Sequence, residues 1–347
     1  MENQEGSCGL PQNPRWQIRK QFFGLPGAED DTEEKNDDRD PDAVHGIPGG
    51  CHVTDVLKNY HGCNVNYPFF LTIPDLERFQ ASSTDIAICG FPKSGSVWLS
   101  AIVHMIRSDA DPACLQQGGV LEEKVPYLEY CTPANYAGYR AIDQLTQLPP
   151  GRAFFTHLSY EALPPSIPQS KTRIISHIRN PKDVMVSTFF HLKSRRQSRF
   201  SGNLEAVIKA FINDEVCYGP YFDHLASYWK HHEDPNVFHL SFEELAKDFN
   251  NVVRRLAKFL GKDLTDEQLK LMAYHTSFDQ MKENERTNRI NAARAGLLNF
   301  EVSPFLRSGS AGNWKLHFSR EMNDNVDEWI AKNLQRADLK GLQFQFE

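Results

Sequence analysis

A lysine inside a glycine-bounded loop is the first feature that could do chemistry. In GFPKSGSVW, residues 90–98, Gly90 and Gly95 have the spacing of a Walker-type phosphate loop, G-x-x-x-x-G-K-[ST]. A Walker lysine follows the second glycine, but here Ser96 occupies that position and Lys93 lies three residues earlier. Backbone N–H groups at a helix start can hold an anion, and Lys93 would then face the bond being broken. Taken alone, the stretch also fits an ordinary strand–helix turn.

Three further stretches carry residue types that bind anions or move protons. Arg179 and Ser187, in RNPKDVMVS, could grip a second phosphate. His157, in THL, could act as a general base. The glycine-rich stretch FLRSGSAGNW, residues 305–314, is typical of a flexible lid over an anion. Each also has a structural interpretation: a surface arginine and a helix serine, a structural histidine, and a surface loop.

The elements that must position these residues alternate along the chain. Apolar runs predict strands, and apolar residues at helical spacing predict helices that begin with Pro181 or with the capping boxes Ser241/Glu244 and Thr265/Gln268. Such alternation predicts an α/β fold: a central, mainly parallel sheet flanked by helices, with ligands at the carboxyl ends of its strands. We expect strands at 85–90, 153–157, 173–178 and 237–240, and helices at 94–107, 181–192, 241–261 and 265–275.

Composition narrows the class of protein. The chain has 347 residues and a net charge of −7, and residues 29–42 hold nine acidic residues against Lys35 and Arg39. We therefore expect a disordered acidic arm at 1–44 and one domain at 45–347 with balanced charge. A balanced surface argues against nucleic-acid binding. The N-terminal stretch has no secretory pattern and no run of about 18 apolar residues occurs, so no membrane association is expected.

The seven cysteines are scattered, odd in number and never arranged as C-x-x-C. This pattern argues against a zinc site or a disulfide framework and fits the reducing cytoplasm. Cys89, in the apolar run DIAIC, is expected to be buried.

The motifs together, in their order, resemble the cytosolic sulfotransferase family and are family 1-like. They are PKSG-x-x-W, THL, RNPKDVMVS, HTSF at 275–278 and FLR-x-G-x-AG-x-W. The resemblance runs from about His45 to the C-terminus and includes VPYLEY at 125–130 and EVCYGPYF at 215–222. It implies a P-loop-like phosphosulfate-binding loop and 3′-phosphoadenosine 5′-phosphosulfate (PAPS) as co-substrate, with no metal.

The resemblance also implies a role for each residue. His157 would deprotonate the hydroxyl or amine of a small acceptor (a phenol, alcohol, sterol or amine), and Lys93 would neutralise the leaving oxygen. Residues 93–98 would hold the 5′-phosphosulfate with Trp98 near the adenine, and Arg179 and Ser187 would hold the 3′-phosphate. The implied PAPS-binding set is Lys93, Ser94, Gly95, Ser96, Val97, Trp98, Arg179, Ser187, Phe242, Thr276, Ser277, Phe278, Met281, Phe305, Leu306, Arg307, Ser308 and Gly309.

Four positions depart from the family pattern. In the loop, Val97 stands where the family has a threonine, and Phe155 stands where it has a lysine, two residues before the base. Phe242 stands where the family has a tyrosine, and Ser308 where it has a lysine. A lost hydrogen bond to a charged group is worth about 1.5–3 kcal/mol. One alternative is therefore a catalytically weakened protein that binds a nucleotide or a small molecule. A second alternative is a P-loop kinase, but the position of Lys93 in the loop argues against it. The retained Lys93, His157, Arg179 and Ser187 favour an enzyme.

Two questions stay open on the sequence alone. Tyr127, Tyr130 and Tyr139 fit an aromatic acceptor pocket or core packing equally well. The family often dimerises through Lys-x-x-x-Thr-Val-x-x-x-Glu, which aligns with KLHFSREMND at 315–324 and puts Arg320 where valine packs. We expect a monomer or a dimer formed elsewhere, unless Arg320 lies along the surface with its charge in solvent.

Overall fold

The computed structural model describes residues 57–66, 69, 72–131, 140–196, 198 and 200–344. They belong to one compact unit, Pro41–Glu347. The predicted acidic arm at 1–44 and Tyr139 lie outside the described residues.

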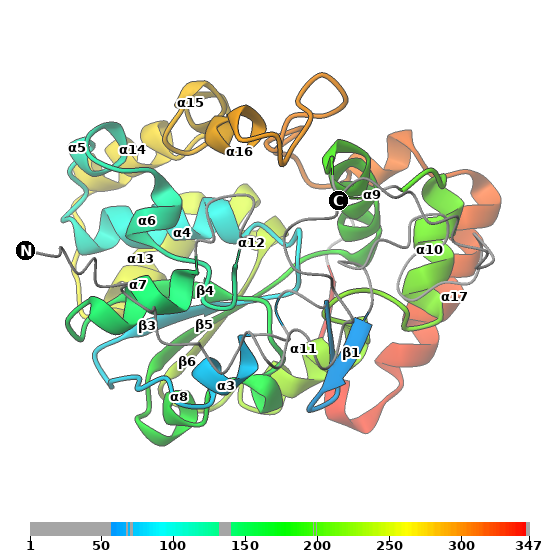
Figure 1. The fold of residues 1–347 in the computed structure, drawn as a ribbon, viewed down its shortest axis with the longest axis horizontal. Coiled ribbons are helices and arrows are strands. Elements are labelled where there is room, and N and C mark those ends of the chain that lie inside the picture. Colours follow the sequence, from blue (N-terminus) through cyan, green and yellow to red (C-terminus); the bar gives the residue numbers. More distant parts are fainter. Residues whose placement is uncertain are drawn as a thin grey trace, which may run out of the picture. The chain divides into compact units, whose positions relative to one another are not determined.

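A four-stranded sheet forms the centre of this unit (Figure 1). Its strands are β3 (Ile86–Cys89), β4 (Ala153–Thr156), β5 (Arg173–Ile178) and β6 (Val237–Ser241), in the order β4-β3-β5-β6. Every neighbouring pair is parallel, with Cys89 opposite Thr156 and Ser176. This confirms the predicted parallel sheet and all four expected strands. Because the strands run in one direction, the residues that follow them meet at one edge.

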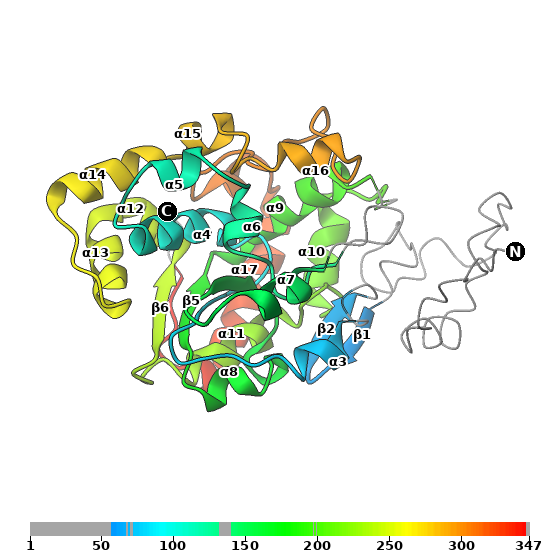
Figure 2. The ribbon, with the colours of Figure 1, turned by 60° about the vertical axis from the view of Figure 1, so that its left-hand side comes forward.

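Alternate residues of β3 enter two separate hydrophobic cores, because successive side chains of a strand point to opposite faces. Ala87 and Cys89 belong to the core under α9 (Pro181–Ser194), α10 (Leu204–Ile212), α11 (Tyr221–Trp229) and α17 (Arg320–Leu334). Ile86 and Ile88 belong to the core under α4 (Ser96–Arg107), α12 (Phe242–Lys247), α13 (Phe249–Phe259) and α14 (Asp266–His275). Figure 2 shows helices on both faces of the sheet, as predicted.

Short elements connect and extend this framework. An antiparallel pair, β1 (Leu57–Tyr60) and β2 (Cys63–Asn66), was not predicted, because eight residues of mixed polarity give no clear strand pattern. The remaining elements are α3 (Ile73–Leu76), α5 (Ala113–Gln116), α6 (Leu121–Lys124), α7 (Ala141–Gln147), α8 (Ser166–Gln169), α15 (Phe278–Glu283), α16 (Ile290–Arg294) and the 3₁₀ helices η3 (Tyr160–Ala162), η4 (Asn313–Leu316) and η5 (Ala337–Leu339).

The single helix predicted at 241–261 is wrong, because the chain breaks it at Asp248. Asp248 leaves helical geometry at φ −139° and ψ 66°, and its side chain accepts from the backbone N–H of Asn251 to start α13. Ser241 does cap α12 by accepting from Glu244 N–H. The capping box predicted at Thr265 is confirmed in full. Among the described residues, no helix has both the length and the apolarity needed to span a bilayer.

Candidate active site

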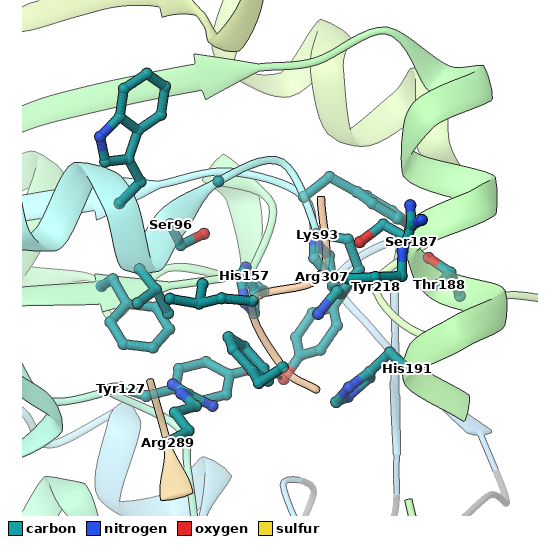
Figure 3. A pocket seen from close by; sticks show the side chains of 18 of the residues that line it. Lys93, Ser96, Tyr127, His157, Ser187, Thr188, His191, Tyr218, Arg289 and Arg307 are labelled. Carbon is teal, nitrogen blue, oxygen red and sulfur yellow. Dashed lines mark hydrogen bonds between the residues drawn. The ribbon is translucent and has the colours of Figure 1, made fainter. Parts of the chain in front are cut away.

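A cavity of about 410 Å³ lies where the sheet's carboxyl ends meet α9 and the 305–309 stretch (Figure 3). His157 follows β4 directly, Arg179 follows β5, and Phe242 follows β6. Two members of the predicted PAPS-binding set do not line the cavity: Ser94, and Ser277, whose hydroxyl caps α15. The members that line it are Lys93, Gly95, Ser96, Val97, Trp98, Arg179, Ser187, Phe242, Thr276, Phe278, Met281, Phe305, Leu306, Arg307, Ser308 and Gly309.

The loop after β3 has a backbone that suits an anion. Gly95 is the N-cap of α4 with φ 107°, and Lys93 also has a positive φ, 70°. The Ser94 hydroxyl is buried with no hydrogen-bond partner among the described residues. Ser96, at the first turn of α4, contacts Nε2 of His177 at 3.0 Å. The loop therefore places a helix start and the Lys93 cation together at the cavity, which fits a bound phosphate or phosphosulfate.

Arg179 joins the loop to the late glycine-rich stretch. Its Nη1 donates to the carbonyl oxygen of Lys93 and its Nη2 to that of Ser310, each at 3.1 Å. Its guanidinium lies over the Phe242 ring, 4.1 Å from the ring centre, and its buried Nε has no described partner. These partners are neutral carbonyl groups and one N–H group has no described partner, so the charge of Arg179 is not neutralised by them. Arg179 can therefore bind an anion.

The 305–314 stretch is anchored on α9. The Asp183 carboxylate accepts from the backbone N–H of Gly312 at 2.7 Å and of Trp314 at 2.9 Å. Gly309, at φ 66°, lies so close to Phe278 that a Cβ there would be 2.2 Å from the ring. These contacts hold Arg307 and Ser308 at the cavity, whether or not the stretch also moves as a lid.

His157 is oriented as a base. Its Nδ1 lies 2.6 Å from the carbonyl oxygen of Gly90. Because a carbonyl only accepts, Nδ1 carries the proton and Nε2 keeps a free lone pair. The backbone N–H of His157 also donates to Oε1 of buried Glu129 at 2.8 Å. Burial lowers the pKa of His157 to about 3, so the imidazole is neutral at neutral pH.

Lys93 is surrounded by cations. Burial, followed by the charges of Arg289, Arg179 and Arg307, lowers the pKa of Lys93 to about 7. Its Nζ lies over the ring of Phe305, 4.2 Å from the ring centre. A bound anion would offset the repulsion and raise this pKa again.

Aromatic residues form the wall beside His157. Tyr127 stacks on Phe155 with ring centres 4.6 Å apart, and its ring meets that of His157 edge-on at 4.9 Å. The hydroxyls of Tyr127 and Tyr218 lie 2.6 Å apart. Tyr127 and Tyr130 both line the cavity, which favours the pocket interpretation over pure core packing.

Several cavity residues were missed by sequence reasoning. His191 lies one turn after Ser187 on α9, and this i, i+4 spacing could have found it. Tyr218 lies within EVCYGPYF, a recognised motif to which no role was assigned. Arg289 lies in a stretch of no clear periodicity, so nothing in the sequence indicated it. Figure 3 shows all three around the cavity with His157.

Comparison with known proteins shows the family of this chain. The sequence model of the sulfotransferase domain matches residues 83–338. Sulfotransferase 1B1 of Mus musculus is 34% identical over 82% of this chain and 94% of its own. Sulfotransferase 1E1 of Bos taurus is 33% identical over 83% of this chain and 96% of its own. The chain belongs to the sulfotransferase family.

Solved structures give the same fold. A mouse sulfotransferase, SULT7A1, complexed with PAP is 27% identical with a TM-score of 0.64, covering 82% of this chain and 95% of its own. A retinol dehydratase in complex with androsterone and the inactive cofactor PAP has a TM-score of 0.75 at 24% identity. The match covers 82% of this chain and 90% of the dehydratase chain. The predicted family, fold and enzyme class, a PAPS-dependent sulfotransferase, are confirmed.

Proposed function

We propose that this cavity transfers a sulfuryl group from PAPS to a hydroxyl or amine of a small acceptor, with His157 as the general base. PAPS, when bound, supplies the activated sulfuryl group and a bisphosphate leaving group. The observation that carries the proposal is the shared cavity: the lone pair of His157 Nε2 and the cations Lys93 and Arg179 border one space. PAP in the related mouse structure supports a nucleotide there.

The loop residues 93–98 would hold the phosphosulfate end. Gly95 begins α4 at the cavity wall with a positive φ, and Lys93 would supply charge at the bond that breaks. Fixed cations and dipoles in a water-poor site stabilise charge that develops in a transition state. Arg179, Ser187 and the Arg307–Gly309 stretch would hold the 3′-phosphate, while Trp98 and Phe278 would border the adenine.

His157 would take the acceptor's proton. Its Nδ1–H is fixed by Gly90, so the ring presents Nε2 without a rearrangement. The low pKa keeps that nitrogen unprotonated, although it also limits its strength as a base. The adjacent wall of Tyr127 and Phe155 would hold the acceptor.

The four departures from the family pattern remove polar groups but leave packed contacts. Phe155 stacks on Tyr127, and Phe242 packs against Gly95 and under Arg179. The Ser308 hydroxyl bonds to Ser310 and to no other residue in the part of the chain that the structure describes. We therefore favour an enzyme with weakened cofactor contacts over a protein that has lost its site.

We further propose that the enzyme acts in the cytoplasm as one domain at 45–347, as a monomer or a non-standard dimer, on small molecules rather than nucleic acids or membranes. The scattered cysteines and the balanced charge of this domain support the proposal.

The test is a screen of phenols, alcohols, sterols and amines with PAPS labelled in its sulfate. Label in a product supports the proposal. Thermal stabilisation by adenosine 3′,5′-bisphosphate without label transfer to any acceptor would favour a binding protein. Tight binding of ATP and magnesium in preference to the bisphosphate would favour a P-loop kinase.

A further inference from the structure

The cavity has more cationic side chains than the proposed PAPS contacts use. Lys93, Arg179, Arg195, Arg289 and Arg307 line it, and no aspartate or glutamate does so among the described residues. Three of these cations are assigned above to PAPS. Arg195 and Arg289 remain outside those assignments.

Arg289 is held in place on two sides. Its Nε lies 2.5 Å from Oε1 of Glu122, an ion pair that lacks hydrogen-bond geometry. The face of its guanidinium lies over Phe305, 4.5 Å from the ring centre. Its backbone has a positive φ of 63°, an uncommon conformation for a residue other than glycine. The side chain is only 21% exposed. The guanidinium therefore has a defined position rather than a solvated one.

The outer edge of this guanidinium is unused. Neither Nη1 nor Nη2 of Arg289 donates a hydrogen bond to any residue that the structure describes. An arginine held by an ion pair on one side and by a ring against its face presents its terminal N–H groups as parallel donors. That arrangement matches a carboxylate, sulfonate or phosphate in a bidentate contact.

Arg289 lies on the acceptor side, near the base. Burial lowers the pKa values of His157 and Lys93, and the charge of Arg289 adds to both effects. Burial raises the pKa of Tyr127, and Arg289 opposes that rise. Figure 3 shows Arg289 on the Tyr127 side of the cavity, away from Ser187 and Thr188 at the α9 end. An anion bound by Arg289 would therefore be separate from the 3′-phosphate.

We propose that the natural acceptor is a hydroxylated aromatic acid, with its anionic group bound by Arg289 and its hydroxyl at Nε2 of His157. This inference rests on the proposed function and narrows its acceptor class. The stacked Tyr127 and Phe155 suit a flat ring between the two groups. A protonated amine carries the same charge as Lys93 and Arg289 and would be repelled by both, which disfavours amines as acceptors.

A competing role would place Arg289 on the transferred sulfonate. Phe155 stands where the family has a lysine, and Arg289 could supply the missing cation. The two roles differ in one measurable way. A cation for the sulfonate serves every acceptor equally, whereas an acceptor-anion site serves only acidic acceptors.

The experiment compares three acceptors with the same phenol: 3-(4-hydroxyphenyl)propanoate, its neutral primary amide, and cationic tyramine. With the full chain and saturating PAPS, we expect kcat/KM for the carboxylate to exceed that for the amide by about tenfold or more, with tyramine lowest. Arg289→Gln should bring the ratio of the carboxylate value to the amide value down by about tenfold or more. Arg289→Lys should retain part of the preference.

Arg294→Gln is the matched control. Arg289 is the N-cap of α16, and Arg294 is the last residue of that helix. Arg294 pairs with Glu285 at the surface, with its side chain 57% exposed. The change removes the same charge five residues further along the chain, outside the cavity lining, so both acceptors should keep their wild-type rates. Thermal unfolding of each variant checks that the fold is retained.

Calorimetry provides a readout without turnover, using the complex with adenosine 3′,5′-bisphosphate. If the wild type binds the carboxylate more tightly than the amide, and Arg289→Gln abolishes this difference, the result supports the inference. It does so even if no acceptor is sulfated, and in that case only the proposed function fails. Equal affinity of the wild type for carboxylate and amide overturns it. An equal loss for both acceptors in Arg289→Gln also overturns it and places Arg289 on the sulfonate.

Discussion

Gly95 and Phe242 approach so closely that a Cβ on Gly95 would lie 2.8 Å from Cδ2 of the ring. Gly95 starts α4 with a positive φ, and Phe242 follows β6 while also supporting Arg179. One contact therefore sets the position of the phosphosulfate loop relative to the arginine proposed for the 3′-phosphate.

We predict that Gly95→Ala largely abolishes binding of adenosine 3′,5′-bisphosphate, measured by calorimetry. The methyl group must displace Phe242, and the left-handed backbone adds about 1–3 kcal/mol of strain. Gly261→Ala is the control, because Gly261 has φ 77° but open space around it. It should lose stability to thermal unfolding and keep nucleotide affinity. Equal nucleotide affinity in both variants would contradict the proposed role of the loop.

Lys93 gives a prediction for pH dependence. In the empty site its pKa is lowered to about 7, so above pH 7 it is mostly neutral. A bound bisphosphate favours the charged form, so binding takes up a proton and the affinity falls as pH rises from 7 to 9, by up to about tenfold per unit. Calorimetry at pH 8 in buffers of different ionisation enthalpy measures this uptake. Lys93→Met should remove it, and a pH-independent wild type would refute the assignment.

Ser308→Lys restores the cation that the family has at this position. Ser308 lines the cavity beside Arg307, and its hydroxyl contacts the hydroxyl and the backbone N–H of Ser310. We expect bisphosphate affinity to rise about tenfold, since a hydrogen bond to a charged group is worth about 1.5–3 kcal/mol. Ser310→Lys, two residues away and outside the cavity lining, should have a much smaller effect. Unchanged affinity in Ser308→Lys would place the 3′-phosphate elsewhere.

The sequence predicted the parts of the site that depend on local patterns. Apolar runs located the strands, so His157, Arg179 and the loop at Lys93 were correctly expected at one edge of a parallel sheet. Arg289 was not predictable, because its approach to the cavity depends on a left-handed backbone and on packing against Phe305, both tertiary features. The helix break at Asp248 was missed because a helical apolar pattern continues across it.

The predicted assembly depends on Arg320. Its side chain is 96% exposed, and it lies 3.8 Å from Asp324. Burying that cation against a second copy would cost several kcal/mol of hydration. We therefore predict a monomer by light scattering at micromolar concentration, or a dimer formed elsewhere. A stable dimer that Arg320→Glu disrupts, and that Lys332→Glu further along α17 does not, would contradict this.

The central claim is that the cavity catalyses transfer through His157, and one comparison tests it most directly. Transfer of labelled sulfate to an accepted substrate is measured for the wild type and for His157→Ala, together with the affinity of each for adenosine 3′,5′-bisphosphate. Because His157 faces the acceptor's proton and not a phosphate, we predict a loss of turnover of about 100- to 10,000-fold with nearly unchanged nucleotide affinity. Near-normal turnover in His157→Ala would contradict the account.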